Sequence, residues 1–226
     1  MKQRKLLPLA ALVMGLACLL GRQVLYRTAV DATGLLRAGT PLEWATYILS
    51  LLAVGLFAAA SGKQTDETLL PAPVSAFGQL LGAVGLGWTA LAYPGEMPGF
   101  LGNLWRILGI AAAACLIWSA YCAIQGKTPH FAALLVPCLF WLAHLIDNYR
   151  GWSGAPQLQS YLFALLGTMS MAILTYYTAA GTIGMGKPRL RKFAALTAGY
   201  FCAAAALPGK NGILYLLCAL WALSSL

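Results

Sequence analysis

The chain has 226 residues, of which 60% are hydrophobic and only 9% are charged, and its formal net charge is +9. Soluble globular domains carry about a quarter charged residues, so this composition excludes water as the main surrounding of the protein surface. The Lys and Arg residues flank long apolar blocks and do not form one basic face, which argues against nucleic acid as a partner.

Apolar blocks of about 20 residues, the length that a bilayer core requires of a helix, recur along the chain, and the alternation of a membrane β-barrel is absent. We therefore predict an all-α, polytopic transmembrane helix bundle that forms a single integral membrane domain over residues 1–226. The six cysteines lie within apolar blocks without disulfide or metal spacing, so neither a metal nor a cofactor is expected. The lipid bilayer is the expected partner.

The first predicted span is the apolar run of residues 6–20, which follows a basic amino terminus in the manner of a signal peptide. Because further apolar segments follow, we expect it to remain as an uncleaved first helix. The polar residues 22–40 after it are predicted to form a loop with a turn at Gly34. A second span is predicted over residues 41–60, where Glu43 suits the positive end of the helix dipole.

The third and fourth spans, predicted over residues 75–93 and 99–123, carry glycines that would let neighbouring helices approach closely. The glycines expected to serve this packing are Gly78 and Gly82 on the third span and Gly102 and Gly109 on the fourth. The fourth span also holds Arg106, about 10 Å below its start at 1.5 Å per residue. An arginine inside hydrocarbon costs ~2.5 kcal/mol or more, so we expect snorkelling to the outer headgroups, an acidic partner or an anionic ligand.

The fifth span begins near His130, is predicted to kink at Pro137 and ends in a polar stretch. His144, Asp147 and Arg150 follow one another at intervals of three, which places them on one face of a helix. A hydrogen-bonded core or interfacial histidine is favoured for His144 over a metal ligand or a proton relay.

The sixth span is predicted over residues 157–183, with Tyr161 near its start. Residues 187–192 form the strongest basic cluster, and two short apolar runs follow at 193–207 and 212–226. Each run would extend about 22 Å, less than the ~30 Å of a bilayer core. The sequence therefore predicts about eight spans, and seven, or six plus a re-entrant hairpin, stay open.

With eight spans, nine of the Lys and Arg residues fall on the amino-terminal side and six on the other, which predicts a cytoplasmic amino terminus in a cell membrane. In this orientation the conspicuous polar residues share the outer level of the membrane. They are Glu43, Arg106, His144, Asp147 and Tyr161. We predict that they line an outward-facing pocket for a small-molecule ligand.

Further residues at loosely fixed spacing carry a resemblance. They are Asp31, Gly34, Leu35 and Leu36 in the first loop, and Phe140, Trp141, Asp147, Arg150, Gly151, Trp152, Ser153, Pro156 and Tyr161 further on. In these positions the chain resembles a group of uncharacterised multi-pass membrane proteins from anaerobic Gram-positive bacteria. The resemblance implies a bacterial source and brings no activity, cofactor or site residue.

Three functions are compatible with this sequence. We expect a small-molecule transporter or binding component built around the outer polar pocket. The alternative is a structural or regulatory membrane subunit that packs against a partner membrane protein through the glycine faces of its third and fourth spans. An intramembrane enzyme using His144 is the weaker alternative, because HExxH, GxSxG and P-loop motifs are all missing and no catalytic residue stands out.

Overall fold

The computed structural model describes residues 2–30, 36–37, 39–62, 71–92, 100–152, 154, 161–207 and 211–226. These ranges form eight α-helices. In chain order the helices are α1 (Lys2–Thr28), α2 (Pro41–Gly62), α3 (Ala72–Ala92), α4 (Phe100–Ile124), α5 (Phe131–Trp152), α6 (Leu162–Thr182), α7 (Pro188–Ala205) and α8 (Gly212–Ser224). The predicted all-α bundle is confirmed. Within the described residues, the helices α1 to α6 are long and apolar enough to cross a membrane.

Two helix boundaries differ from the prediction. The loop expected from residue 22 is wrong in its first part, because α1 continues to Thr28 and carries Arg22 inside the bundle. The helix α7 begins at Pro188, so most of the basic cluster forms its first turns, with proline at the position where its fixed φ suits a helix start. In both cases the prediction placed the charged residues outside the apolar segment, whereas the structure includes them in α1 and α7.

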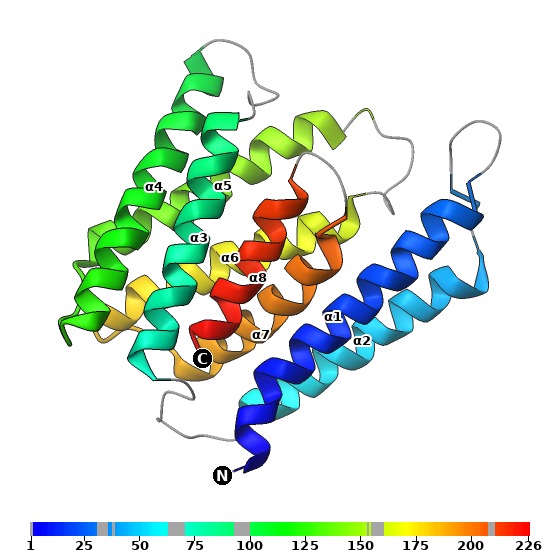
Figure 1. The fold of residues 1–226 in the computed structure, drawn as a ribbon, viewed down its shortest axis with the longest axis horizontal. Helices are drawn as coiled ribbons and strands as arrows, with labels where there is room; N and C mark the ends of the chain where they lie inside the picture. The colour runs from blue at the N-terminus through cyan, green and yellow to red at the C-terminus, as the bar shows by residue number, and fades with distance from the viewer. Residues whose placement is uncertain are drawn as a thin grey trace.

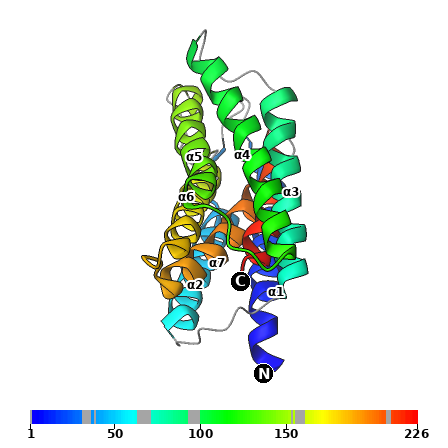
Figure 2. The ribbon, with the colours of Figure 1, turned by 90° about the vertical axis from the view of Figure 1, so that its left-hand side faces the viewer.

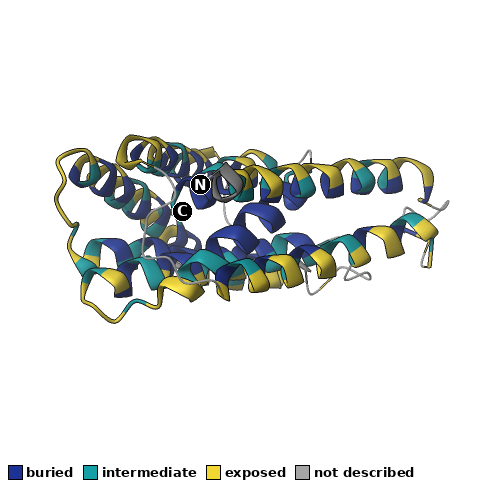
Figure 3. Cartoon of the chain, turned by 90° about the horizontal axis from the view of Figure 1, so that it is seen from below, coloured by how far each residue is buried: buried dark blue, intermediate teal, exposed yellow. Residues whose placement is uncertain are grey.

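The helices are arranged in two layers. Figure 2 shows α4, α3 and α1 on one side and α5, α6 and α2 on the other, with α7 in the middle, and α8 lies between α3 and α7 in Figure 1. The two layers turn their buried faces toward each other and their exposed faces outward (Figure 3). The connections from α1 to α2 and from α4 to α5 cross between the layers, at opposite ends of the bundle.

The helix α7 is the centre of the bundle. Every residue from Ala194 to Ala205 is buried, which is the pattern of a helix enclosed on all sides. Its 18 residues correspond to about 27 Å, and the 13 residues of α8 to about 20 Å. Longer helices pack beside both, and the carboxyl-terminal turns of α8 are buried, whereas Ile213 near its amino end is exposed.

Glycine contacts set the spacing of several helix pairs. A Cβ added to Gly82 would lie 2.7 Å from the Trp221 ring, and one added to Gly78 would overlap Ser224, so the glycine face of α3 is covered by α8 of the same chain. On α4, a Cβ at Gly109 would lie 2.7 Å from Ala90 of α3, and Gly102 is buried. Pro137 lies inside α5, which continues on both sides of it.

Candidate functional site

His144 belongs to a packed aromatic cluster. Its side chain is 1% exposed, and its ring stacks on Phe140 and Trp105 with centroids 5.5 Å and 5.9 Å away. Tyr215 of α8 lies 6.4 Å away, and the Asn148 Nδ2 atom lies 2.8 Å from the His144 Nε2 atom. An amide that donates to Nε2 places the imidazole proton on Nδ1. Aromatic rings therefore surround the imidazole, and packing explains its position without a ligand.

The other residues of the predicted outer pocket are spread over the bundle. Arg106 is half-buried on α4 beside Trp105, and Asp147 is buried at 4% exposure on α5. Among the described residues, no ion pair joins these two. Glu43 lies on α2, and α2 makes no contact with α4 or α5 in the described part of the chain. Figure 1 shows α2 on the opposite side of the bundle from α4, so Glu43 lies apart from the predicted pocket residues on α4 and α5.

Tyr161 precedes the first turn of α6 and is half-buried. The candidates for the predicted ligand pocket remain Tyr161, Arg106, His144 and Asp147. None of these four residues lines a cavity described below. Glu43 serves a local role, since its Oε2 atom accepts a hydrogen bond of 2.8 Å from the Gly39 backbone N–H ahead of α2. This contact agrees with the expectation that Glu43 lies near the positive end of the helix dipole.

A buried arginine that sequence reasoning placed in a loop lies at the carboxyl end of α7. Arg22 is 3% exposed, and its guanidinium donates a hydrogen bond of 2.6 Å to the Ala204 carbonyl oxygen. Its Cζ atom lies 4.4 Å from the centroid of the Phe163 ring. The last carbonyls of a helix have no partner within the helix and carry its negative dipole end, so a cation here supplies both a donor and a compensating charge.

A pattern of small residues along one face of α1 could have predicted that Arg22 lies on a buried face. These small residues precede it at intervals of three or four, and they are Ala11, Gly15 and Cys18. All three are buried, and a Cβ at Gly15 would lie 2.8 Å from the Tyr200 carbonyl oxygen. Arg22 continues this face of α1 toward α7. The hydropathy pattern alone shows only that a charged residue occurs at this position.

A hydrogen-bond chain joins α7 to α2. The Ser50 hydroxyl donates to the Thr46 carbonyl oxygen at 2.7 Å and lies 2.9 Å from the hydroxyl of the fully buried Tyr200. Because the single proton of Ser50 is used within α2, Tyr200 is the donor of the second bond. This bond fixes α2 on α7 at mid-length.

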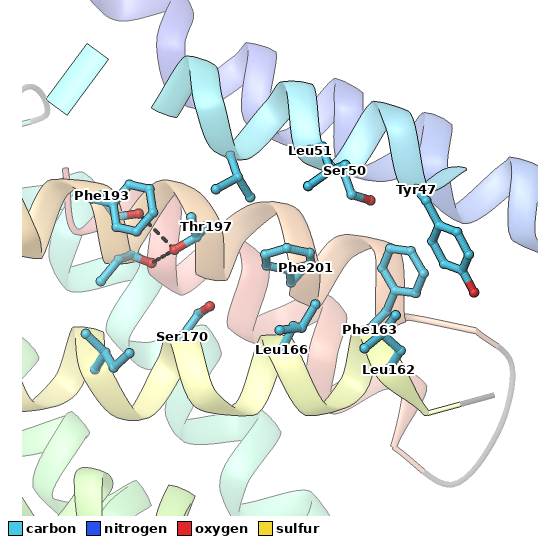
Figure 4. A pocket seen from close by; sticks show the side chains of 13 residues that line it. Tyr47, Ser50, Leu51, Leu162, Phe163, Leu166, Ser170, Phe193, Thr197 and Phe201 are labelled. Carbon is cyan, nitrogen blue, oxygen red and sulfur yellow. Dashed lines mark hydrogen bonds between the residues drawn. The ribbon is translucent and has the colours of Figure 1, made fainter. Parts of the chain in front are cut away.

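A cavity in the described part of the chain forms a groove between α2 and α6. Both helices pack on α7, but they do not touch each other, so α7 forms the floor between them (Figure 4). The cavity has a volume of about 490 Å³. Its lining residues are Tyr47, Ser50, Leu51 and Val54 of α2, Leu162, Phe163, Leu166, Ser170 and Ile173 of α6, and Phe193, Ala194, Thr197 and Phe201 of α7.

The groove surface is mostly apolar, although four of its lining residues carry hydroxyl groups, namely Tyr47, Ser50, Ser170 and Thr197. The Thr197 hydroxyl donates to the Phe193 carbonyl oxygen at 2.9 Å, and the Ser50 proton is used as described above. Side chains at the rim face outward, since Leu51 is 74% and Ile173 is 49% exposed. A cavity with this lining, open along its side, can accommodate a hydrocarbon chain and offers no arrangement for acid, base or metal chemistry.

The fold and the groove define a multi-pass helical membrane protein: six helices suit a membrane span, and a buried α7 packs against α1, α2 and α6. Comparisons of the chain with protein-family models, with curated proteins and with solved structures give no match. The function is therefore inferred from the groove, the buried polar residues and the charges of this chain alone.

Proposed function

We propose that the protein binds a membrane lipid, with one hydrocarbon chain of the lipid in the groove between α2 and α6. The observation that carries this proposal is the apolar groove of about 490 Å³. Its volume lies within the roughly 300–1,000 Å³ of small-molecule sites. In a membrane such a groove is filled by hydrocarbon, because leaving it empty would forfeit the dispersion contacts of its lining.

Chain binding alone gives little specificity. Lipid tails are as apolar as leucine side chains, so a tail that enters the groove from the bilayer gains no hydrophobic free energy. Affinity must then come from the shape of the groove and from polar groups at its ends. At one end Phe163 closes the groove, and the Arg22 guanidinium behind this ring already donates to Ala204. Selection of a lipid is therefore expected from the other end.

This proposal keeps the binding component expected from the sequence and moves the ligand from the outer polar residues to the groove. The alternative of a subunit that docks through the glycines of α3 has less support, because Gly78 and Gly82 lie against α8. Transport of the bound lipid would need a second arrangement of the helices around α7, so the proposal is limited to binding.

Photolabelling tests the proposal. The purified protein is reconstituted with a phospholipid that carries a diazirine on one acyl chain, irradiated, digested and mapped by mass spectrometry. We expect adducts concentrated on groove residues such as Leu166 and Phe201, several-fold above those on Ile107, which is 62% exposed on the outer face of α4.

A matched pair of variants supplies the control. The substitution Leu166→Trp fills the groove and should suppress labelling there, whereas Ile107→Trp adds the same ring on the outer face of α4 and should leave groove labelling unchanged. Labelling spread evenly over all outward-facing helices, or groove labelling indifferent to Leu166→Trp, would refute the binding of a lipid chain in the groove.

A further inference from the structure

A second cavity lies at the turn between α6 and α7. Its volume is about 220 Å³. It is lined by Tyr177, Gly181, Gly184, Gly186, Lys187, Pro188 and Arg191. In contrast to the groove, two basic side chains contribute to its wall, and no acidic side chain does.

The second cavity continues the line of the groove. On α6, Tyr177 follows the groove residue Ile173 by four positions, and on α7, Arg191 precedes the groove residue Ala194 by three. Residues three or four apart share one face of a helix. The same faces of α6 and α7 thus line the apolar groove along most of their length and the basic cavity at their connected ends.

The basic side chains are available for an external anion. Arg191 is half-buried, and among the described residues no hydrogen bond or ion pair engages its guanidinium or the Lys187 ammonium. A partly buried cation without an acidic neighbour is compensated well by an anionic ligand. Lys187 and Pro188 also stand at the amino end of α7, where the helix dipole adds to the positive potential.

Glycines keep this cavity open. Gly184 has a φ of 74°, and a Cβ at Gly186 would lie 2.6 Å from the Gly181 Cα atom, so the turn folds tightly onto the end of α6. The wall between Lys187 and Tyr177 is therefore bare backbone. A headgroup can approach it without displacing side chains.

We propose that Lys187 and Arg191 bind the phosphate of an anionic phospholipid whose acyl chain occupies the groove. The inference rests on the proposed lipid binding and adds the class of headgroup. Charge complementarity favours this occupant: the positive-inside rule places the basic cluster at the cytoplasmic surface, and anionic lipids are the anions abundant there. A phosphate in the cavity and a chain in the groove satisfy the polar and the apolar half of one continuous site.

The test compares lipids with identical chains and different headgroups. Photoactivatable phosphatidylglycerol and phosphatidylcholine, each with the same dioleoyl-length chains, are competed for groove labelling in nanodiscs of defined composition. Both lipids carry a phosphate, but in phosphatidylcholine the choline ammonium offsets its charge beside Lys187 and Arg191. We therefore expect labelling by phosphatidylglycerol to exceed that by phosphatidylcholine about tenfold, which corresponds to about 1.4 kcal/mol. In Arg191→Gln this preference should fall to near unity, and in Lys187→Gln it should fall partly.

Arg189→Gln is the matched control. Arg189 lies on the same helix, carries the same charge, is exposed and does not line the cavity. It should keep the headgroup preference of the unmodified protein, because its side chain does not line the cavity. Arg191→Lys, which keeps the charge, should retain part of the preference and excludes a folding defect as the cause.

Each outcome decides between the two proposals. Equal labelling by the two lipids, or equal losses in Arg189→Gln and Arg191→Gln, overturns the recognition of an anionic headgroup by Lys187 and Arg191 and leaves chain binding in place. Displacement of phosphatidylglycerol by millimolar inorganic phosphate overturns the lipid as occupant. If neither lipid labels the groove, both the phosphate site and the proposed lipid binding fail.

Discussion

The contact between α3 and α8 gives a quantitative test of the packing. In Gly82→Ala, the new Cβ would lie 2.7 Å from the Trp221 ring, about 1 Å inside the optimal separation of carbon atoms. Trp221 is only 5% exposed, and the cavity that it lines has a volume of only about 30 Å³, so the ring has little room to shift. Overpacking of this kind costs roughly 1–3 kcal/mol, and the better helix propensity of alanine returns about 0.5–1 kcal/mol. We expect a net destabilisation of up to about 2.5 kcal/mol.

The matched control is Gly55→Ala on α2, where an added Cβ meets no atom within 4 Å. It should gain the helix propensity alone and stabilise the protein by up to about 1 kcal/mol. Both free energies are measured by reversible unfolding in mixed micelles with increasing dodecyl sulfate, followed by circular dichroism. The double variant Gly82→Ala/Trp221→Ala should show a favourable coupling energy. If Gly82→Ala is as stable as Gly55→Ala, close contact between α3 and α8 does not limit the packing, and the reasoning is refuted.

Three further predictions concern buried polar groups. Arg22→Met should destabilise the bundle by roughly 1–3 kcal/mol in the same unfolding assay, because the Ala204 carbonyl loses its donor; an unchanged stability would show that the carbonyl does not need it. Tyr200→Phe removes the donor to Ser50 and should cost about 1 kcal/mol, and a stability equal to wild type would count against this bond. Arg106→Leu should abolish binding of a polar ligand with insertion intact if the predicted outer pocket exists, and thermal-shift screening of anionic small molecules against both proteins decides it.

The apolar blocks were sufficient to predict the number and order of the helices, because each block must satisfy its own backbone hydrogen bonds within the bilayer. Helix ends were predicted less well where charge occurs inside a helix. The hydropathy of α1 falls at Arg22, yet the partner of that arginine is a carbonyl on α7. A contact over such a sequence distance leaves no local pattern from which to predict it.

The candidate site was the hardest part to predict. Depth along the membrane can be derived from sequence, and it placed Glu43, Arg106 and His144 at one level. Lateral position depends on which helices are neighbours, and α2 proved remote from α4 and α5. The groove arises because α2 and α6 both pack on α7 without meeting, a property of three helices that no single segment encodes.

The attachment of the α1–α2 hairpin also has a consequence for biogenesis. This hairpin leaves the ribosome before α7, on which it mainly packs and whose first residue is Pro188. At a synthesis rate of about 5–20 residues per second, the 125 residues between Gly62 and Pro188 delay that partner by roughly 6–25 s. During this interval the Arg22 guanidinium has no carbonyl on α7 to bind, so the α1–α2 hairpin lacks its main packing partner. Its docking onto α7, late in synthesis, creates the groove.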